Sequence, residues 1–211
     1  MNHAEHADHG AAADAAVPAW LTDAWAAEHL DGPSRDPLHE EARLAAVDAL
    51  GADDVERVQP LTEDLLAGVS AGTGAPVGLL NVVLSGAQII SGAHGLTGWL
   101  AEARATPAEW ALCATVVRTG EAYVVPDLTA DAATADNPLA VVDGMRAYAG
   151  VPLRTSTGHV IGSMCVLDTE PREFSADDLA ALEVAADEAV RRLEQQAGGG
   201  AEVAGPGGAT S

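Results

Sequence analysis

The chain contains no lysine, so its ten basic residues are all arginines, and they are set against 32 aspartates and glutamates. The formal net charge is −22 at pH 7. A surface this negative repels the phosphate backbone of nucleic acids and the anionic headgroups of lipids. We therefore expect neither nucleic acid nor a membrane to be a direct partner.

Long apolar runs and a secretory leader are also missing. No run in the 211 residues approaches the roughly 20 apolar residues that a membrane-spanning helix needs. The first ten residues, MNHAEHADHG, have neither a basic start nor an apolar core. The sequence therefore predicts a cytoplasmic protein.

Cysteine and aromatic residues are scarce. The two cysteines, Cys113 and Cys165, are expected to be free thiols, because a cytoplasmic pair seldom forms a structural disulfide. No cysteines and histidines stand at metal-ligand spacing, so we expect no metal site. Aromatics make up 3% of the chain and apolar residues 48%, which predicts an aliphatic core for one domain of ordinary size.

Composition divides the chain into four parts. Residues 1–17 lack apolar periodicity and residues 198–211 are rich in glycine, so both are predicted to be disordered tails. Residues 18–60 read as a helical lead-in, and residues 61–197 as the folded domain.

Hydrophobic periodicity and turn residues place the elements of the ordered part. Helices are expected at 36–50, from 61 to about 72, at 106–119 and from 175 onward; strands are expected at 77–84, 87–91, 122–125, 148–153 and 159–167. Thr106 and Glu109 look like a capping box for the third helix. The acidic loop at 126–144 contains four aspartates that lack the tight spacing of a calcium loop. This order predicts an α+β fold with helices on an antiparallel sheet of five to six strands.

Three stretches carry a resemblance to a known family. RTGEAYVVPD, YAGVPL and GSMCVLD followed by TEPREFS occur in an order and spacing that resemble a GAF domain, a small-molecule-sensing module of bacterial signalling proteins. The resemblance covers residues 61–193 and implies a free-standing sensory module. It also implies terminal helices on one face of the sheet, often paired in a homodimer. A ligand pocket would lie on the other face, beneath the helix at 106–119 and the acidic loop.

The resemblance implies a set of candidate pocket residues in this sequence. The candidates are His94, Trp99, Trp110, Cys113, Arg146, Tyr148, Met164 and Cys165. Alternation puts Ile161, Ser163, Cys165 and Leu167 on one face of their strand, and Val160, Gly162, Met164 and Val166 on the other. Periodicity alone leaves open which set faces the pocket. Arg146 either pairs with an anionic ligand or neutralises the acidic loop, and we favour the second interpretation.

The cofactor stays unknown, because the motifs for familiar ligands are absent. Bilin-binding relatives commonly have histidine after the attachment cysteine, whereas Ala114 follows Cys113. The cyclic-nucleotide signature includes a lysine, which this chain lacks. His94 and His159 are the candidate haem ligands, and we expect both to be surface histidines.

Three functional hypotheses remain. The first is a regulatory module that binds a small molecule or a signalling protein and signals through paired helices. The second is a thiol enzyme of the free methionine-R-sulfoxide reductase type that uses Cys113 and Cys165, although we expect structural thiols. The third is a scaffold without a ligand, which a closed core beneath the helix at 106–119 would favour.

Overall fold

A computed structural model describes residues 36–201. The expectations for the tail at 1–17, for the lead-in before residue 36 and for residues 202–211 lie outside the described residues. Within residues 36–201, no helix combines the length and the apolar character that crossing a membrane requires.

Six strands form one sheet in the order β3-β2-β1-β6-β5-β4, and each neighbouring pair is antiparallel. The strands are β1 Val77–Val83, β2 Ala87–His94, β3 Ala105–Pro107, β4 Tyr123–Val125, β5 Ala147–Arg154 and β6 Val160–Asp168. The predicted α+β class with an antiparallel sheet is confirmed.

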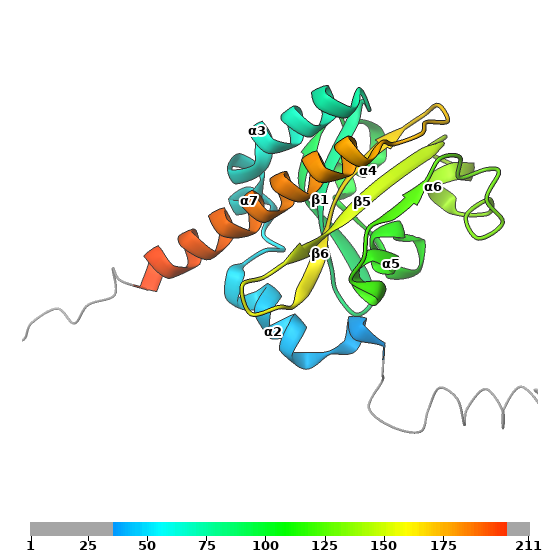
Figure 1. Cartoon of the computed structure of the whole chain (residues 1–211). Coiled ribbons are helices and arrows are strands. Elements are labelled where there is room, and N and C mark those ends of the chain that lie inside the picture. Colours follow the sequence, from blue (N-terminus) through cyan, green and yellow to red (C-terminus); the bar gives the residue numbers. More distant parts are fainter. Residues whose placement is uncertain (1–35, 202–211) are drawn as a thin grey trace, which may run out of the picture. The chain divides into compact units, whose positions relative to one another are not determined.

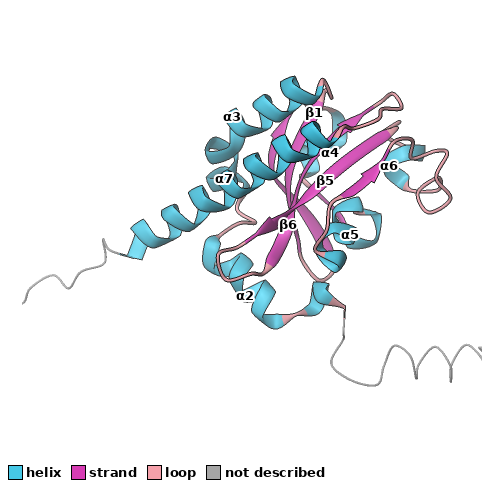
Figure 2. Ribbon diagram, viewed as in Figure 1, coloured by secondary structure: helices cyan, strands magenta, loops and turns pink. Residues whose placement is uncertain are grey.

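Helices cover both faces of the sheet. They are η1 Pro37–His39, α2 Glu41–Leu50, α3 Val55–Thr73, α4 Gly98–Ala103, η2 Ala108–Trp110, α5 Leu112–Thr119, α6 Pro138–Val141 and α7 Ala176–Ala201. Figure 1 shows α3 and α7 side by side, and Figure 2 shows them lying across the strands. The apolar residues accordingly form two clusters, one beneath α2, α3 and α7 and the other beneath α4, α5 and α6.

The boundary expected at residue 61 falls inside a helix. Asp54 caps α3 by accepting a hydrogen bond from the backbone N–H of Arg57 (3.1 Å), so α3 begins at Val55. Arg43 ties the lead-in to the sheet, because its buried guanidinium donates to the carbonyl oxygens of Pro37, Leu38 and Val83. Residues 36–60 are therefore part of the same folded unit as the rest of the described chain.

The helix expected at 106–119 begins later than its capping signature predicts. Thr106 lies in β3 opposite Gln88, because the edge of β2 offers backbone hydrogen bonds to an extended, β-branched residue. Pro107 ends this edge strand, where its missing N–H costs no ladder bond. A 3₁₀ turn follows, and α5 starts at Leu112.

A bulge in β6 changes the predicted alternation. Leu153 pairs with Gly162 and Arg154 pairs with Val160, which leaves Ile161 without a partner in β5. Ile161 therefore joins Met164 in the cluster beneath the terminal helices, whereas Val160 joins Cys165 beneath α5. The predicted face sets are correct from residue 162 onward and wrong for the two residues before it.

The final helix begins as predicted and ends later. Ser175 and Asp178 form a reciprocal cap: Asp178 N–H donates to Ser175 Oγ (3.1 Å) and Ser175 N–H donates to Asp178 Oδ2 (2.8 Å). The helix continues to Ala201, beyond residue 198 where a disordered tail was expected. Each further residue adds one backbone bond to an existing ladder, so the helix extends past its last buried core residue, Leu193.

Candidate functional site

The two cysteines meet in the core. Cys113 of α5 and Cys165 of β6 are both buried, with their sulfur atoms 4.0 Å apart. Asn81 Nδ2 donates to both sulfurs at 3.3 Å, and Tyr148 Oη donates to Cys113 Sγ at 3.3 Å. We call these residues, with Ser163, which lies 3.4 Å from Tyr148 Oη, the thiol cluster.

Small residues in this part of the sheet make room for the protein itself. A Cβ atom on Gly150, which pairs with Cys165 in the ladder, would overlap the hydroxyl of Tyr148 on the α5 side of the sheet. One on Gly162, which shares the opposite face with Met164, would overlap the backbone carbonyl oxygen of Asn81. The space beneath α5 is therefore filled by Tyr148 and the two thiols. This corrects the expectation of a ligand-sized hollow between α5 and the sheet.

The thiol cluster is electrostatically uneven. The hydrogen bond between Cys113 and Cys165, assisted by Tyr148, Ser163 and Asn81, lowers the pKa of Cys113 despite its burial. The same hydrogen bond, together with burial, raises the pKa of Cys165 well above its usual range. Burial likewise raises the pKa of Tyr148. Cys113 is thus the thiol better prepared to ionise, but neither cysteine lines the two cavities described next.

An open pocket of about 450 Å³ lies between α4 and the turn after α6. We call it the outer pocket. Its lining residues are Pro76, Val77, Gly95, Leu96, Thr97, Gly98, Trp99, Leu100, Val142, Asp143, Met145 and Thr169. Trp99 Nε1 donates to Asp143 Oδ1 at 2.7 Å, whereas Asp143 Oδ2 is enclosed and has no hydrogen-bond partner among the described residues.

Local turns hold these two side chains in place. Gly95 and Gly98 have φ of +71° and +68°, a region that favours glycine, and the turns they make lead into α4, where Trp99 is the second residue. Asn137 caps α6 by accepting from Leu139 N–H (2.9 Å) and donates to the carbonyl oxygen of Trp110 (3.0 Å). These two hydrogen bonds hold the start of α6, and Asp143, two residues beyond the end of this helix, lines the outer pocket.

A smaller cavity, the inner hollow, adjoins the outer pocket. Its volume is about 30 Å³, and it shares Leu96, Leu100 and Met145 with the outer pocket. Gln88 of β2 and Thr106 of β3 supply its polar lining. Gln88 is 5% exposed, its Nε2 lies 3.5 Å from Thr106 Oγ1, and in the described part of the chain its Oε1 has no hydrogen-bond partner.

The predicted site residues divide between these places. Cys113, Tyr148 and Cys165 meet in the thiol cluster, and Trp99 lines the outer pocket. Met164 packs beneath the terminal helices, because its position in β6 points to the opposite face, so it does not belong to the candidate site. His94 is exposed at the end of β2.

The remaining two candidates have structural contacts. Arg146 forms a bidentate ion pair with Asp127 of the acidic loop, at 2.9 and 2.7 Å, which is the interpretation in which it neutralises that loop. This pairing holds the pKa of Asp127 well below its usual range. Trp110 is half-buried in η2, outside the helix that carries Cys113.

Sequence reasoning missed Gln88, Met145 and the role of Asp143. Asp143 was considered only as a calcium ligand, and Gln88 stands in a strand where a polar residue can face either water or the core. The glycines in HGLTGW and the DG pair at 143–144 were the available signal, because they mark tight turns on both sides of the outer pocket.

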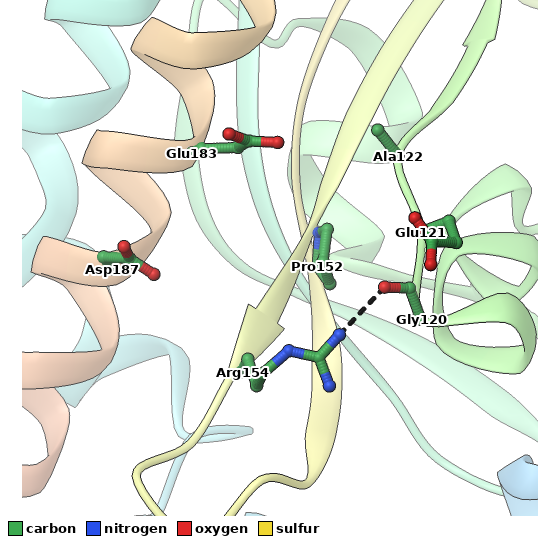
Figure 3. Close-up of a pocket in the computed structure, with 7 residues that line it drawn as sticks. All are labelled: Gly120, Glu121, Ala122, Pro152, Arg154, Glu183 and Asp187. Atoms are coloured by element: carbon green, nitrogen blue, oxygen red, sulfur yellow. Dashed lines mark hydrogen bonds between the residues drawn. The ribbon is translucent and has the colours of Figure 1, made fainter.

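A second surface depression, of about 320 Å³, lies between β5 and α7 (Figure 3). Arg154 donates to the carbonyl oxygen of Gly120 at 2.9 Å, and Glu183 and Asp187 project from α7. The walls thus carry a cation and carboxylates together, and within the described residues none of its hydrogen-bonding atoms is both buried and unpartnered. The outer pocket, with its unpartnered carboxylate oxygen, is therefore the better candidate site.

Comparisons with known proteins agree with this architecture. The GAF domain family matches residues 57–193. A Pseudomonas aeruginosa protein named as a cyclic di-GMP phosphodiesterase is 34% identical over 151 residues, which are 70% of this chain and 24% of that protein. The chain therefore spans about a quarter of the length of this curated relative.

Solved structures share the fold at low identity. The second GAF domain of DevS from Mycobacterium smegmatis has a TM-score of 0.53 and 20% identity, covering 68% of this chain and 97% of that domain. Free methionine-R-sulfoxide reductase from Neisseria meningitidis has a TM-score of 0.53 and 20% identity, covering 79% of this chain and 96% of the enzyme. With a family match that covers more than half of its length and the sheet that the family's structures share, the chain belongs to the GAF domain family.

Proposed function

We propose that this GAF domain is a cytoplasmic regulatory module that binds a small molecule in the outer pocket. The observation that carries the proposal is a pocket of about 450 Å³ lined by Asp143, whose enclosed Oδ2 has no hydrogen-bond partner within residues 36–201. A buried polar atom without a partner is costly, and a ligand that draws the Asp143 side chain into the pocket and donates to it removes that cost. Pockets of this size are typical of small-molecule sites.

Two further observations support a regulatory role. The chain matches a quarter of a relative named as a cyclic di-GMP phosphodiesterase. We infer that it corresponds to one module of such a protein rather than to the whole enzyme. The terminal helices α3 and α7 are held together by Arg192, which donates to Asp64 Oδ1 (2.6 Å) and to the carbonyl oxygen of Leu61 (2.8 Å). We propose that this helix pair transmits the effect of ligand binding to a partner. That the pair also forms a homodimer interface is a prediction, which sedimentation velocity tests.

The two other hypotheses are less well supported. A thiol enzyme needs its sulfur atoms to reach a substrate, whereas Cys113 and Cys165 line neither the outer pocket nor the inner hollow. The filled space beneath α5 suits a ligand-free scaffold, but such a scaffold gives no reason for the unpartnered oxygen of Asp143.

Native mass spectrometry tests the proposal. We expect protein purified gently from its native host to carry a small molecule that is absent from Met145→Trp, because a tryptophan there fills the shared wall of both cavities. Val184→Trp, at an exposed position on α7, is the matched control and should retain the molecule. A wild-type protein that carries nothing, and whose melting temperature no compound in a metabolite panel raises, would overturn the proposed function.

A further inference from the structure

The outer pocket has a one-sided electrostatic character. Asp143 is the single charged side chain among its described lining residues, and most of the others are apolar or glycine. The nearby Arg146 is already paired with Asp127, and Arg172 is paired with Asp168 at 2.8 Å. No cation is therefore available in the lining to receive an anionic ligand, and the net charge of −22 opposes its approach.

The residues that line the two adjoining cavities include two unsatisfied hydrogen-bonding groups, and both are acceptors. Asp143, which lines the outer pocket, and Gln88, which lines the inner hollow, each have an enclosed acceptor oxygen, Oδ2 and Oε1, without a partner among residues 36–201. Gln88 is 5% exposed, so bulk water does not satisfy its oxygen. An acceptor is satisfied only by a donor, so a molecule toward which either side chain turns must carry N–H or O–H groups.

Trp99 adds a second preference. Its indole N–H is held by Asp143, yet the residue lines the pocket and 43% of it is exposed, which leaves aromatic surface open to a ligand. An aromatic face within about 6 Å of a positive charge attracts it, and a carboxylate attracts the same charge. An ammonium group satisfies the carboxylate by a charge-assisted hydrogen bond and suits the ring at once.

We infer that the outer pocket binds a small organic ammonium ion, a primary amine with a short apolar body, whose head group donates to Asp143 and whose body lies on Leu96, Leu100 and Val77. This inference rests on the proposed function, since it names the ligand class of the same pocket. The inner hollow has room for about one small group, such as a water molecule donating to Gln88.

Calorimetric titration with 2-phenylethylammonium tests the charge requirement. Two probes of similar shape differ in the head group: neutral 2-phenylethanol and anionic 3-phenylpropionate. We expect the ammonium ion to bind at least ten times more tightly than either. Equal binding of the alcohol, tighter binding of the carboxylate, or no binding of the ammonium ion at millimolar concentration would overturn the inference.

Two aspartate variants locate the binding. Asp143→Asn should weaken ammonium binding at least tenfold, because the amide loses the negative charge. Asp136→Asn, at an exposed aspartate of the same loop, removes an equal charge and should leave the affinity unchanged. If both variants weaken binding equally, general electrostatics rather than Asp143 attracts the probe, and the inference fails.

The outcomes separate the ligand class from the proposed function. If 2-phenylethanol or 3-phenylpropionate binds at least as tightly as the ammonium ion and Met145→Trp abolishes that binding, the pocket is a ligand site and the ammonium inference alone is wrong. If no molecule co-purifies and no compound binds the wild-type protein, both are wrong.

Discussion

At the scale of single residues, the thiol cluster shows how little free space lies beneath α5. Tyr148, Cys113 and Cys165 occupy the region where a ligand hollow was expected, and Gly150 leaves the space that the Tyr148 hydroxyl fills. The glycine and the tyrosine are therefore energetically coupled, and the cost of changing one depends on the other.

A double-mutant cycle measures this coupling. Gly150→Ala should lower the free energy of unfolding by about 1 to 3 kcal/mol, because its methyl group overlaps the Tyr148 hydroxyl. Tyr148→Phe should cost about 1 kcal/mol through the lost hydroxyl contacts. In the Tyr148→Phe background, the penalty of Gly150→Ala should shrink by at least about 0.5 kcal/mol. Additive penalties in urea unfolding would show that the two residues do not compete for this space.

The burial of the thiols gives a second prediction at this scale. Native protein should not react with a thiol-specific disulfide reagent within minutes, because the reaction requires an opened core. Protein unfolded in 6 M guanidinium should release two equivalents of the reagent's leaving thiol per chain, one for each cysteine. Fast, stoichiometric reaction of the native protein would reopen the thiol-enzyme hypothesis.

Single residues were also where sequence reasoning was weakest. The alternation of β6 was readable from the sequence, but the bulge at Ile161 moved two side chains, because it depends on the pairing with β5. Asp143 resembled its neighbouring loop aspartates. Only the hydrogen bond from Trp99, 44 residues away in the chain, sets it apart.

At the scale of elements, the lead-in is held to the sheet by one buried cation. Arg43 donates to carbonyl oxygens of η1 and β1 and has no carboxylate in hydrogen-bonding contact within residues 36–201. Burial lowers the pKa of its guanidinium, which nevertheless stays charged near neutral pH. The carbonyl oxygen of Pro37 also accepts from the backbone N–H of Glu40 (3.2 Å), so the loss of Arg43 bears most on the carbonyl oxygens of Leu38 and Val83.

Arg43→Met should lower the free energy of unfolding by about 3 to 5 kcal/mol, the range for disrupting a buried charged network. The matched control is Arg57→Met, because Arg57 makes an exposed contact to Gln196 (2.7 Å) and its loss should cost within about 0.5 kcal/mol. Chemical denaturation of both variants decides the matter. A cost for Arg43→Met no larger than that for Arg57→Met would show that the lead-in is not anchored by this residue.

Most elements could be predicted because their signals are local. Gly51 ends α2, Gly120 ends α5 and Ser175 begins α7 as the sequence indicated. Thr106 was assigned to a helix cap because Thr-x-x-Glu is a local signature. The edge of β2, which recruits Thr106 into β3, is a partner that no local pattern contains.

At the scale of the whole molecule, ion pairs on α7 make stability depend on pH. Hydrogen bonds from Arg191 and Arg192 lower the pKa of Glu188 from 4.5 to about 2. A carboxylate with a depressed pKa in the folded state stabilises the protein above its unfolded pKa, and this contribution is lost as the pH falls through the folded value. The Glu188 contribution is therefore complete above about pH 4.5 and declines toward pH 2.

Glu188→Gln should be less stable than the wild type at pH 7, and the difference should shrink as the pH is lowered from about 4.5 toward 2. Urea unfolding at a series of pH values and fixed salt measures the difference, in which the effect of the net charge largely cancels. Glu183→Gln on the same helix is the control, since Glu183 forms no ion pair within residues 36–201. A wild-type-to-Glu188→Gln gap that stays constant down to pH 3 would contradict the account.

The central claim is that ligand binds between α4 and Asp143, beside the packed core rather than beneath α5. Methionine methyl NMR tests it directly, because Met145 lines the outer pocket and Met164 lies on the opposite face of the sheet. Titration with 2-phenylethylammonium should shift the methyl resonance of Met145, assigned with Met145→Leu, and leave that of Met164 in place. A shift of Met164 with Met145 unchanged, or no shift of either at millimolar concentration, would contradict the account.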